Sequence, residues 1–381
     1  MTEAAEMLAA GLAFAVWVYL LAFHGRFWSA GPALDGNFPT LSRSLPRLDV
    51  VIPARDEADC LGTALRSLLV QDYPGPFRII VVDDGSTDGT GDIARALGDP
   101  RLTVMDGAPR PPGWSGKLWA VAQGVAAGDA PIVLLTDADI VHDRGHLTAL
   151  AAKLETGLDM VSEMVELRCS SLAERALVPA FVFFFQLLYP FARVNDPHSR
   201  VAAAAGGTVL VRRTALDRIG GIESLRGALI DDVALAARLK PNGGIWLGHS
   251  RLARSMRPYA GPADIWRMVA RTAYVQLRFS PLLLAGTVAG LALVWLAPAG
   301  IALCGNGPAR WLAAAAWAGS MASYIPTLRR FRQSPAWALA LPGIASFYMA
   351  ATIGSAIDHH RGRGVQWKNR LYQGAGQGAD A

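Results

Sequence analysis

Cysteine is scarce in this chain, and the three cysteines are far apart: Cys60, Cys169 and Cys304. Because no Cys-x-x-Cys pair occurs, neither a zinc site nor a disulfide framework is expected, and the main domain is predicted to lie in a reducing compartment. Charged residues make up only 18% of the chain, against about 25% in an average soluble protein. The deficit lies at the two ends, since residues 45–275 have an ordinary globular composition.

Glycine-rich phosphate-binding patterns are also missing. Neither Gly-x-Gly-x-x-Gly nor Gly-x-x-x-x-Gly-Lys-Ser/Thr occurs, which removes the main support for a dinucleotide site or a P-loop. The net charge of +5 comes without a clustered basic segment, so no nucleic-acid partner is expected. The arginines mostly flank hydrophobic segments, which indicates an anionic membrane surface.

Long apolar segments lie at both ends of the chain. Residues 8–23 are almost entirely apolar, with acidic residues before them and basic residues after them. This charge pattern predicts one membrane span followed by a cytoplasmic domain. Three further candidate spans are 281–304, 311–327 and 335–357. Three full spans would leave the basic tail outside, so either one segment is re-entrant or the tail is an exception to the charge rule.

Between these ends, apolar runs alternate with amphipathic ones. Strands are predicted at 48–53, 78–83, 102–105, 132–135, 159–167 and 201–211. Helices are predicted at 58–70, 88–97, 117–127 and 230–239. The alternation predicts an α/β domain with a doubly wound, mostly parallel sheet. The apolar segment 176–191 is either a helix in the membrane interface, near where a lipid would enter, or a buried core helix.

Two pairs of acidic residues follow predicted strands. Asp83 and Asp84 come at the end of strand 78–83, while Asp137 and Asp139 follow strand 132–135. Ligands of open α/β sheets bind at this edge, beyond the carboxyl ends of the strands. On an extended chain, the i, i+2 spacing would place Asp137 and Asp139 on one side, where they could hold a divalent cation and, through it, a diphosphate. The alternative is that these acids cap turns.

Three segments have side chains that can serve a ligand or a reaction. Asp84 and its neighbour can accept hydrogen bonds from a uracil N–H and ribose hydroxyls, and Gly85 lets a base approach the backbone. Lys117 begins a predicted helix, where a cation opposes the helix dipole, so an anionic ligand is expected nearby. Asp231 and Asp232 begin another helix, and helix capping needs only one of them.

Three motifs, in this order and spacing, resemble those of family 2 glycosyltransferases with the GT-A fold, over roughly residues 48–250. They are 50–57 (Val-Val-Ile-Pro-Ala-Arg-Asp-Glu), 81–90 (Val-Val-Asp-Asp-Gly-Ser-Thr-Asp-Gly-Thr) and 136–139 (Thr-Asp-Ala-Asp). Residues 113–117 (Gly-Trp-Ser-Gly-Lys) resemble a segment of the ceramide glucosyltransferase-like group. The whole layout, with the tail segment 362–370, is similar to the hopene-associated glycosyltransferases.

This resemblance implies a membrane-bound inverting enzyme with the GT-A fold. It would use Mg²⁺ or Mn²⁺ and move a sugar from a UDP-sugar to a hopanoid- or triterpenoid-related lipid. The reaction would take place at the cytoplasmic leaflet of a bacterial inner membrane. Asp232 would be the catalytic base and Asp139 the metal ligand. The residues implied for the nucleotide-sugar are Pro53, Arg55, Glu57, Asp83, Asp84, Lys117, Asp137 and Arg271. Those implied for the acceptor or sugar pocket are Trp114, Gly206, Gly207 and Asp231.

The implied domain order places the GT-A catalytic domain between membrane segments. We expect a transmembrane anchor at 1–28, a linker at 29–46, the catalytic domain at 47–255, an interfacial basic helix at 256–280, transmembrane segments at 281–357 and a basic tail at 358–381.

The match to the family is imperfect at Arg271. Segment 265–271 stands where the family has Gln-x-x-Arg-Trp, but Met268 replaces Gln and Thr272 replaces Trp. Arg271 therefore either reaches the diphosphate or belongs to a basic helix face at lipid headgroups. A processive polysaccharide synthase is the alternative enzyme, and it should have more spans and an intact motif. A non-catalytic membrane scaffold is the alternative from another class, and it would not need Asp139, Lys117 and Asp232 together.

Overall fold

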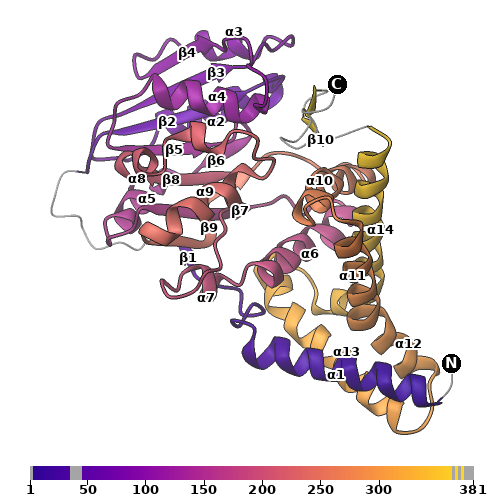
Figure 1. The fold of residues 1–381 in the computed structure, drawn as a ribbon. Coiled ribbons are helices and arrows are strands. Elements are labelled where there is room, and N and C mark those ends of the chain that lie inside the picture. The colour runs from indigo at the N-terminus through magenta and orange to yellow at the C-terminus, as the bar shows by residue number, and fades with distance from the viewer. Residues whose placement is uncertain (1–2, 35–44, 363–364, 368–369, 373–381) are drawn as a thin grey trace. The chain divides into compact units, whose positions relative to one another are not determined.

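The computed structural model describes residues 3–34, 45–362, 365–367 and 370–372 (Figure 1). The chain forms two compact units. An α/β unit contains residues 32–168, 193–258 and 366–381, and a helical unit contains residues 1–31, 169–192 and 259–365. Most of the predicted linker, at 35–44, and most of the predicted tail lie outside the described residues.

A mixed sheet is the centre of the α/β unit. Its strands are β1 (Ala33–Leu34), β2 (Leu48–Ala54), β3 (Phe77–Asp83), β4 (Leu102–Asp106), β5 (Ile132–Thr136), β6 (Ile140–His142), β7 (Met160–Glu166), β8 (Thr208–Arg212) and β9 (Ile245–Ser255). Their order is β1-β9-β7-β8-β5-β2-β3-β4, and β6 pairs with β9. Strand β8 is antiparallel to β5 and β7, and β6 is antiparallel to β9. The remaining pairs are parallel, which confirms the predicted sheet type.

Helices cover both faces of this sheet (Figure 1). The helices of this unit are α2 (Ala58–Leu69), α3 (Thr90–Arg95), α4 (Gly116–Ala126), α5 (His146–Leu154), α8 (Arg213–Arg218) and α9 (Asp231–Leu239). The boundary between the two units falls within the short helix α7 (Phe191–Val194). On β3, Ile79 and Val81 pack with the leucines of α2 and α5, whereas Ile80 and Val82 pack with Ala120 of α4. Because both faces are buried, the strands are continuous apolar runs in the sequence.

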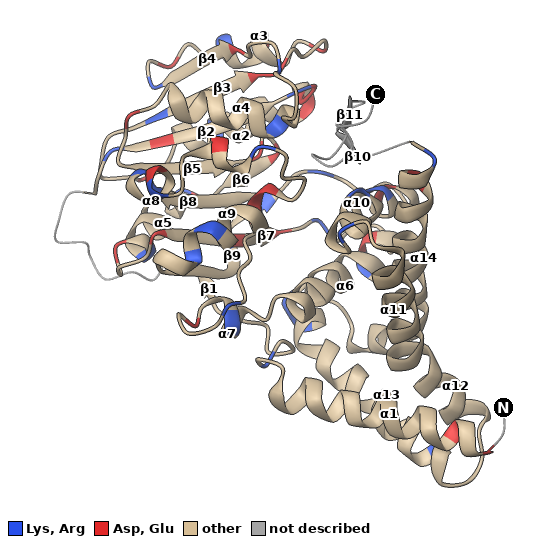
Figure 2. Cartoon of the chain, viewed as in Figure 1, with Lys and Arg blue, Asp and Glu red and all other residues tan. Residues whose placement is uncertain are grey.

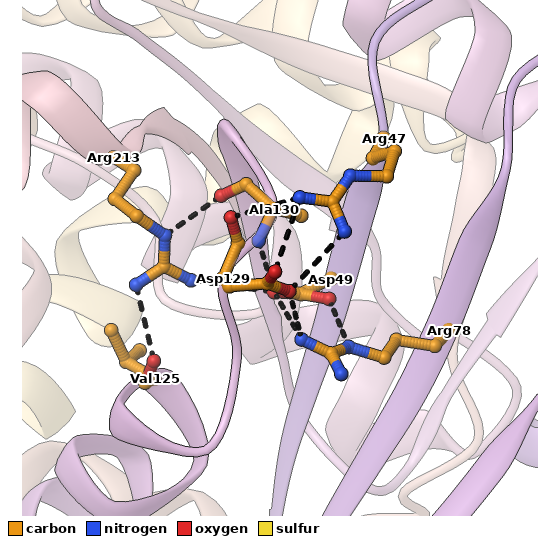
Figure 3. Close-up of polar contacts among 7 residues, drawn as sticks. All are labelled: Arg47, Asp49, Arg78, Val125, Asp129, Ala130 and Arg213. Carbon is orange, nitrogen blue, oxygen red and sulfur yellow. Dashed lines mark hydrogen bonds and ion pairs between the residues drawn. The ribbon is translucent and has the colours of Figure 1, made fainter.

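A charged cluster closes the amino-terminal edge of the central strands (Figure 3). Asp49 of β2 is 1% exposed. It accepts a hydrogen bond from Arg78 Nε at 2.5 Å and from the Ala130 N–H at 2.8 Å, and Arg213 Nη2 lies 3.3 Å away. A buried carboxylate needs such partners because leaving water is costly for a charge. The cluster therefore connects β2, β3, the turn before β5 and α8.

The short strands β1 and β6 were not predicted, and the prediction also differs from the structure at β8 and β9. The predicted strand 201–211 begins only at Thr208, because residues 201–205 have no regular secondary structure and Gly206 and Gly207 form a turn. Strand β9 was not predicted, because its polar residues and Gly248 interrupt the apolar pattern that marks a strand.

The helical unit contains α1 (Glu3–Phe23), α6 (Leu172–Leu188), α10 (Pro262–Gln276), α11 (Pro281–Leu291), α12 (Ala297–Cys304), α13 (Gly307–Arg330) and α14 (Leu341–His360). Within the described residues, three helical segments are long and apolar enough to cross a membrane: Glu3–Phe23, Pro281–Cys304 and Pro335–His360. Figure 2 shows few charged residues along these helices. The predicted span 311–327 lies in α13, which is not among the three; it packs against α1 and α12.

Helix α6 has a defined start and a buried face. Ser171 accepts a hydrogen bond from the Glu174 N–H, and Glu174 accepts one from the Ser171 N–H, which forms a capping box. Phe183 is fully buried and Tyr348 of α14 donates a hydrogen bond to the Leu177 carbonyl. The helix is thus part of the packed interior of its unit, and its position at a membrane interface stays a prediction.

Candidate active site

Four of the predicted side chains meet at the carboxyl edge of β5. Lys117, in the first turn of α4, places Nζ 2.7 Å from Asp137 Oδ1. Asp231 and Asp232 in the first turn of α9 also act on this ammonium group. A pocket here is lined by Pro53, Lys117, Leu118, Val121, Leu135, Thr136, Asp137, Gly206, Val209, Ile222, Leu225, Asp231, Asp232 and Leu235. Its wall is mostly apolar, with one cation and three carboxylates.

The pocket changes the pKa values of its charged groups. Desolvation, followed by the charge of Asp231, raises the pKa of Asp232 to about 6, although Lys117 and backbone N–H groups of Val233 and Gly206 oppose the shift. Desolvation alone would lower the pKa of Lys117, but the nearby carboxylates outweigh it and raise the pKa. Lys117 is therefore a permanent cation, and Asp232 is a carboxylate that exchanges a proton near neutral pH. Such a pKa suits a general base.

Asp137 and Asp139 interact with different cations. Strand β5 ends at Thr136 and residues 138–139 form a turn, so the alternation of an extended chain stops before the motif does. Asp139 Oδ2 accepts hydrogen bonds from Arg257 Nε at 2.9 Å and Ser255 Oγ at 3.0 Å. The expectation that the two acids share one side of an extended strand was therefore wrong.

The acids after β3 are held by local hydrogen bonds. Arg55 Nη1 donates to the carbonyls of Asp84 and Gly85 and lies 3.8 Å from Asp84 Oδ2. Asp83 Oδ1 accepts a hydrogen bond from the Ser86 N–H at 2.9 Å. Both carboxylates are buried. Their predicted role in nucleoside binding stays a prediction.

The remaining predicted residues lie in different surroundings. Trp114 is buried before α4, with its ring 5.2 Å from the Trp119 ring in an edge-to-face arrangement. Gly206 lies against Asp232, and the Gly207 carbonyl accepts a hydrogen bond from Thr136 Oγ1 at 2.9 Å. Arg271 is on α10 of the helical unit, and its contribution to the site stays a prediction.

The sequence analysis missed a buried series of hydrogen-bonded side chains that begins at Thr136, next to Asp137. Because the Thr136 hydroxyl donates to Gly207, His142 Nε2 must donate to Thr136 Oγ1, 3.3 Å away. His142 Nδ1 then accepts from His146 Nδ1 at 2.8 Å, so His146 Nε2 carries no hydrogen and accepts from a protonated Glu163 Oε2, 2.6 Å away. Burial lowers the pKa of His142 well below its usual value and that of His146 to about 3. The two neutral rings thus hold Thr136 in one orientation.

Sequence signals for the missed residues exist but are weak. His142 and His146 are four residues apart, which is a common spacing on any helix or turn. Arg257 follows β9, a strand that was not predicted. Neither pattern would separate these residues from ordinary surface residues.

The side chains at this edge of the sheet can be compared with the ligands that a divalent cation requires. Among the described residues, no group of three or more His, Cys, Asp or Glu side chains is placed to hold a metal. Mg²⁺ nevertheless often binds through one or two carboxylates together with substrate phosphates. The two contacts of the Asp139 carboxylate both use Oδ2, so Oδ1 remains for a cation. Asp139 therefore fits a metal that a diphosphate would complete.

Comparison with known proteins agrees with this geometry. Residues 49–220 match the model of the glycosyl transferase family 2. A mannosyltransferase from Pyrobaculum calidifontis, PcManGT, solved in complex with GDP-Man and Mn²⁺, aligns over 96% of this chain and 99% of its own with a TM-score of 0.56 and 22% identity. That likeness shows the fold.

Curated relatives match shorter parts of the chain. The 4,4'-diaponeurosporenoate glycosyltransferase of Staphylococcus aureus (strain bovine RF122 / ET3-1) is 37% identical over 101 residues, 26% of each protein. The probable glycosyltransferase YdaM of Bacillus subtilis (strain 168) is 24% identical over 235 residues, 59% of this chain and 55% of that protein. The chain thus spans about a quarter of the first relative and about half of the second.

The sheet order and the likeness to PcManGT show that the α/β unit has the GT-A fold. The part of the chain from β2 to β8 therefore resembles the glycosyl transferase family 2, whose model matches it.

Proposed function

We propose that the protein is a membrane-bound inverting glycosyltransferase that moves a sugar from a UDP-sugar to a lipid hydroxyl at the cytoplasmic leaflet. The observation that supports this most directly is the carboxylate of Asp232, whose pKa is raised to about 6 beside Lys117 in the pocket. An inverting transfer needs one positioned base and no protein nucleophile. One carboxylate with this pKa meets that need.

The residues divide the reaction between them. Asp232 takes the proton of the acceptor hydroxyl while its oxygen attacks the anomeric carbon from the face opposite the nucleotide. The bond from that carbon to the diphosphate breaks, and UDP leaves with the electron pair. Lys117 stabilises the charge that develops on UDP, because a fixed cation needs no reorganisation during the reaction. Asp137 orients Lys117 through their 2.7 Å contact.

A divalent cation is the proposed cofactor, Mg²⁺ or Mn²⁺, with Asp139 as its protein ligand. It would supply positive charge to the leaving diphosphate. The carboxylates of this edge outnumber the cations that pair with them, so a diphosphate would meet net repulsion without added positive charge. The Mn²⁺ in the PcManGT complex supports the same choice.

A lipid acceptor is supported by three independent features. Three helical segments can cross a membrane, the Staphylococcus relative is named for 4,4'-diaponeurosporenoate, and the motif layout resembles the hopene-associated enzymes. We therefore propose a hopanoid- or triterpenoid-related acceptor and a multi-pass location in a bacterial inner membrane.

The proposal is tested by release of UDP from a panel of UDP-sugars, with full-length protein in detergent and a bacterial lipid extract. Wild type should release UDP and form a glycolipid that is detected by mass spectrometry. Asp232→Asn should lower the rate by about a thousandfold while it binds UDP within twofold of wild type. An Asp232→Asn protein that retains the wild-type rate would contradict the assignment.

A further inference from the structure

Arg257 connects two nearly buried carboxylates at the predicted metal position. Its Nε donates to Asp139 Oδ2 at 2.9 Å and its Nη2 donates to Glu57 Oε1 at 2.9 Å. The side chains of Asp139 and Glu57 are 7% and 11% exposed, whereas that of Arg257 is 43% exposed. Arg257 lies beyond the residues that match the family model. It is thus a cation, open to solvent, that neutralises acids predicted to bind metal and nucleotide-sugar.

The backbone fixes Arg257 in this place. Strand β6 pairs with the end of β9, with Ile140 opposite Ser255. The Met256 N–H donates to the Asp139 carbonyl at 2.9 Å, and the Arg257 N–H donates to Ser255 Oγ at 3.2 Å. Sheet pairing therefore delivers the guanidinium to Asp139. A chance contact of a surface arginine would lack this support.

A guanidinium in this position has two consequences. It opposes a second cation on Asp139, because like charges at such short range repel. It can also bind phosphate oxygens well, because its planar array of donors suits them. In the described part of the chain its two contacts use Nε and Nη2, which leaves Nη1 without a protein partner.

We infer that Arg257 is a built-in counter-ion that weakens the binding of free divalent metal and transfers its hydrogen bonds to the donor diphosphate when metal and nucleotide arrive together. This inference rests on the proposed function, since it requires a diphosphate at Asp139. Metal and nucleotide are then coupled, and each strengthens the binding of the other by the same factor. Arg257 makes this factor large, so the site is loaded by the complete metal–nucleotide pair.

The test measures two binding constants of the full-length protein in detergent. Free Mn²⁺ is titrated by electron paramagnetic resonance without nucleotide, and UDP is titrated by calorimetry at saturating Mn²⁺. Arg257→Gln should bind Mn²⁺ about tenfold more tightly without UDP. It should bind UDP about tenfold more weakly with Mn²⁺. Loss of structure would not strengthen metal binding, so the two opposite shifts separate this role from a structural one.

Arg254→Gln is the matched control. Arg254 is on β9, three residues before Arg257, and it is 58% exposed and pairs with Asp143 at 3.5 Å. The substitution therefore removes the same charge from a neighbouring position. It should change neither constant by more than twofold. If Arg257→Gln does not fold, Arg257→Lys keeps the charge and loses the second contact, and it should show a smaller increase in Mn²⁺ affinity, about threefold.

The outcomes separate the inference from the function on which it rests. If wild type binds UDP with Mn²⁺ but Arg257→Gln binds free Mn²⁺ no better than wild type, the inference is wrong and the function stands. If wild type does not bind UDP with Mn²⁺ at all, the proposed function fails and the inference fails with it.

Discussion

Asp232 and Asp231 show how adjacent residues of one type can differ in chemistry. Both lie in the first turn of α9, but the pKa of Asp232 is raised to about 6 by desolvation and by the neighbouring charge of Asp231. Lys117 limits the shift. Desolvation, Asp231 and Lys117 together set the pKa of the Asp232 carboxylate to about 6. A helix cap alone would have no use for this arrangement.

The pH dependence of transfer should report this group. Below pH 6 the rate should fall about tenfold per pH unit, because Asp232 becomes protonated and cannot accept the hydroxyl proton. Asp231→Asn removes the neighbouring charge and should lower the apparent pKa of the profile by about one unit. UDP release from pH 4.5 to 8 measures both profiles. Asp217→Asn, at an exposed acid, should leave the profile unchanged, and an Asp231→Asn profile identical to wild type would contradict the assignment.

Single positions were predictable from sequence where a local rule applies. Lys117 and the pair at 231–232 stand out because they begin helices, where a cation is unfavourable and a second acid is unnecessary. Arg257 and Asp139 are 118 residues apart, and no local rule connects them. Their pairing depends on β9, which the sequence pattern does not mark as a strand.

At the scale of elements, continuous apolar runs identified the central strands because both faces of the sheet are covered. The same reasoning failed beyond Thr136, where the chain turns and Asp137 and Asp139 separate. It also failed for the buried histidines, since a polar residue in a core is stable only when its partners are present. Those partners are Thr136 of β5 and Glu163 of β7.

The cluster around Asp49 should stabilise the sheet without affecting chemistry (Figure 3). Asp49→Asn removes the negative charge with which Arg78 and Arg213 pair, and it should lower the free energy of unfolding by about 2 kcal/mol. This loss is smaller than is usual when a fully buried ion pair is broken, because Arg78 is 40% exposed. Asp129→Asn removes a carboxylate that is 66% exposed and should cost less than about 1 kcal/mol. Denaturant unfolding in detergent measures both, and equal losses would contradict the role of burial.

The buried histidines should make stability depend on pH. Their pKa values are lowered on folding, so the unfolded chain takes up protons first as the pH falls. Their contribution is complete above about pH 6.5 and is lost progressively as the pH falls toward about 3. From pH 7 to 5.5 the two rings should cost about 2.5 kcal/mol of stability.

A non-titrating variant isolates this effect. Asp232 has the opposite effect on the pH dependence of stability, because its pKa is raised on folding. The stability of each variant must therefore be compared with that of wild type at the same pH. His146→Gln should lose about half of the histidine contribution, whereas His198→Gln, at an exposed position, should follow wild type. A His146→Gln protein with the full pH dependence would show that His146 does not hold a neutral buried ring.

At the scale of the whole molecule, two units are built from interleaved segments of one chain. The helical unit joins the beginning of the chain to its later part, where Trp17 Nε1 donates to the Val294 carbonyl at 2.9 Å. The length of the apolar runs in the sequence predicted the three helical segments that can cross a membrane, at residues 3–23, 281–304 and 335–360. It could not predict how the segments assemble, because packing between helices distant in sequence leaves no periodic signal.

The central claim is that the acidic edge of the sheet binds a nucleoside diphosphate through a divalent cation. Isothermal calorimetry of detergent-purified protein with UDP, in Mn²⁺ and then in EDTA, tests it most directly, with GDP as the comparison nucleotide. We predict UDP binding that requires Mn²⁺, exceeds GDP binding and is lost in Asp139→Ala. Absence of UDP binding under both conditions would contradict the account and favour a non-catalytic membrane scaffold with the same fold.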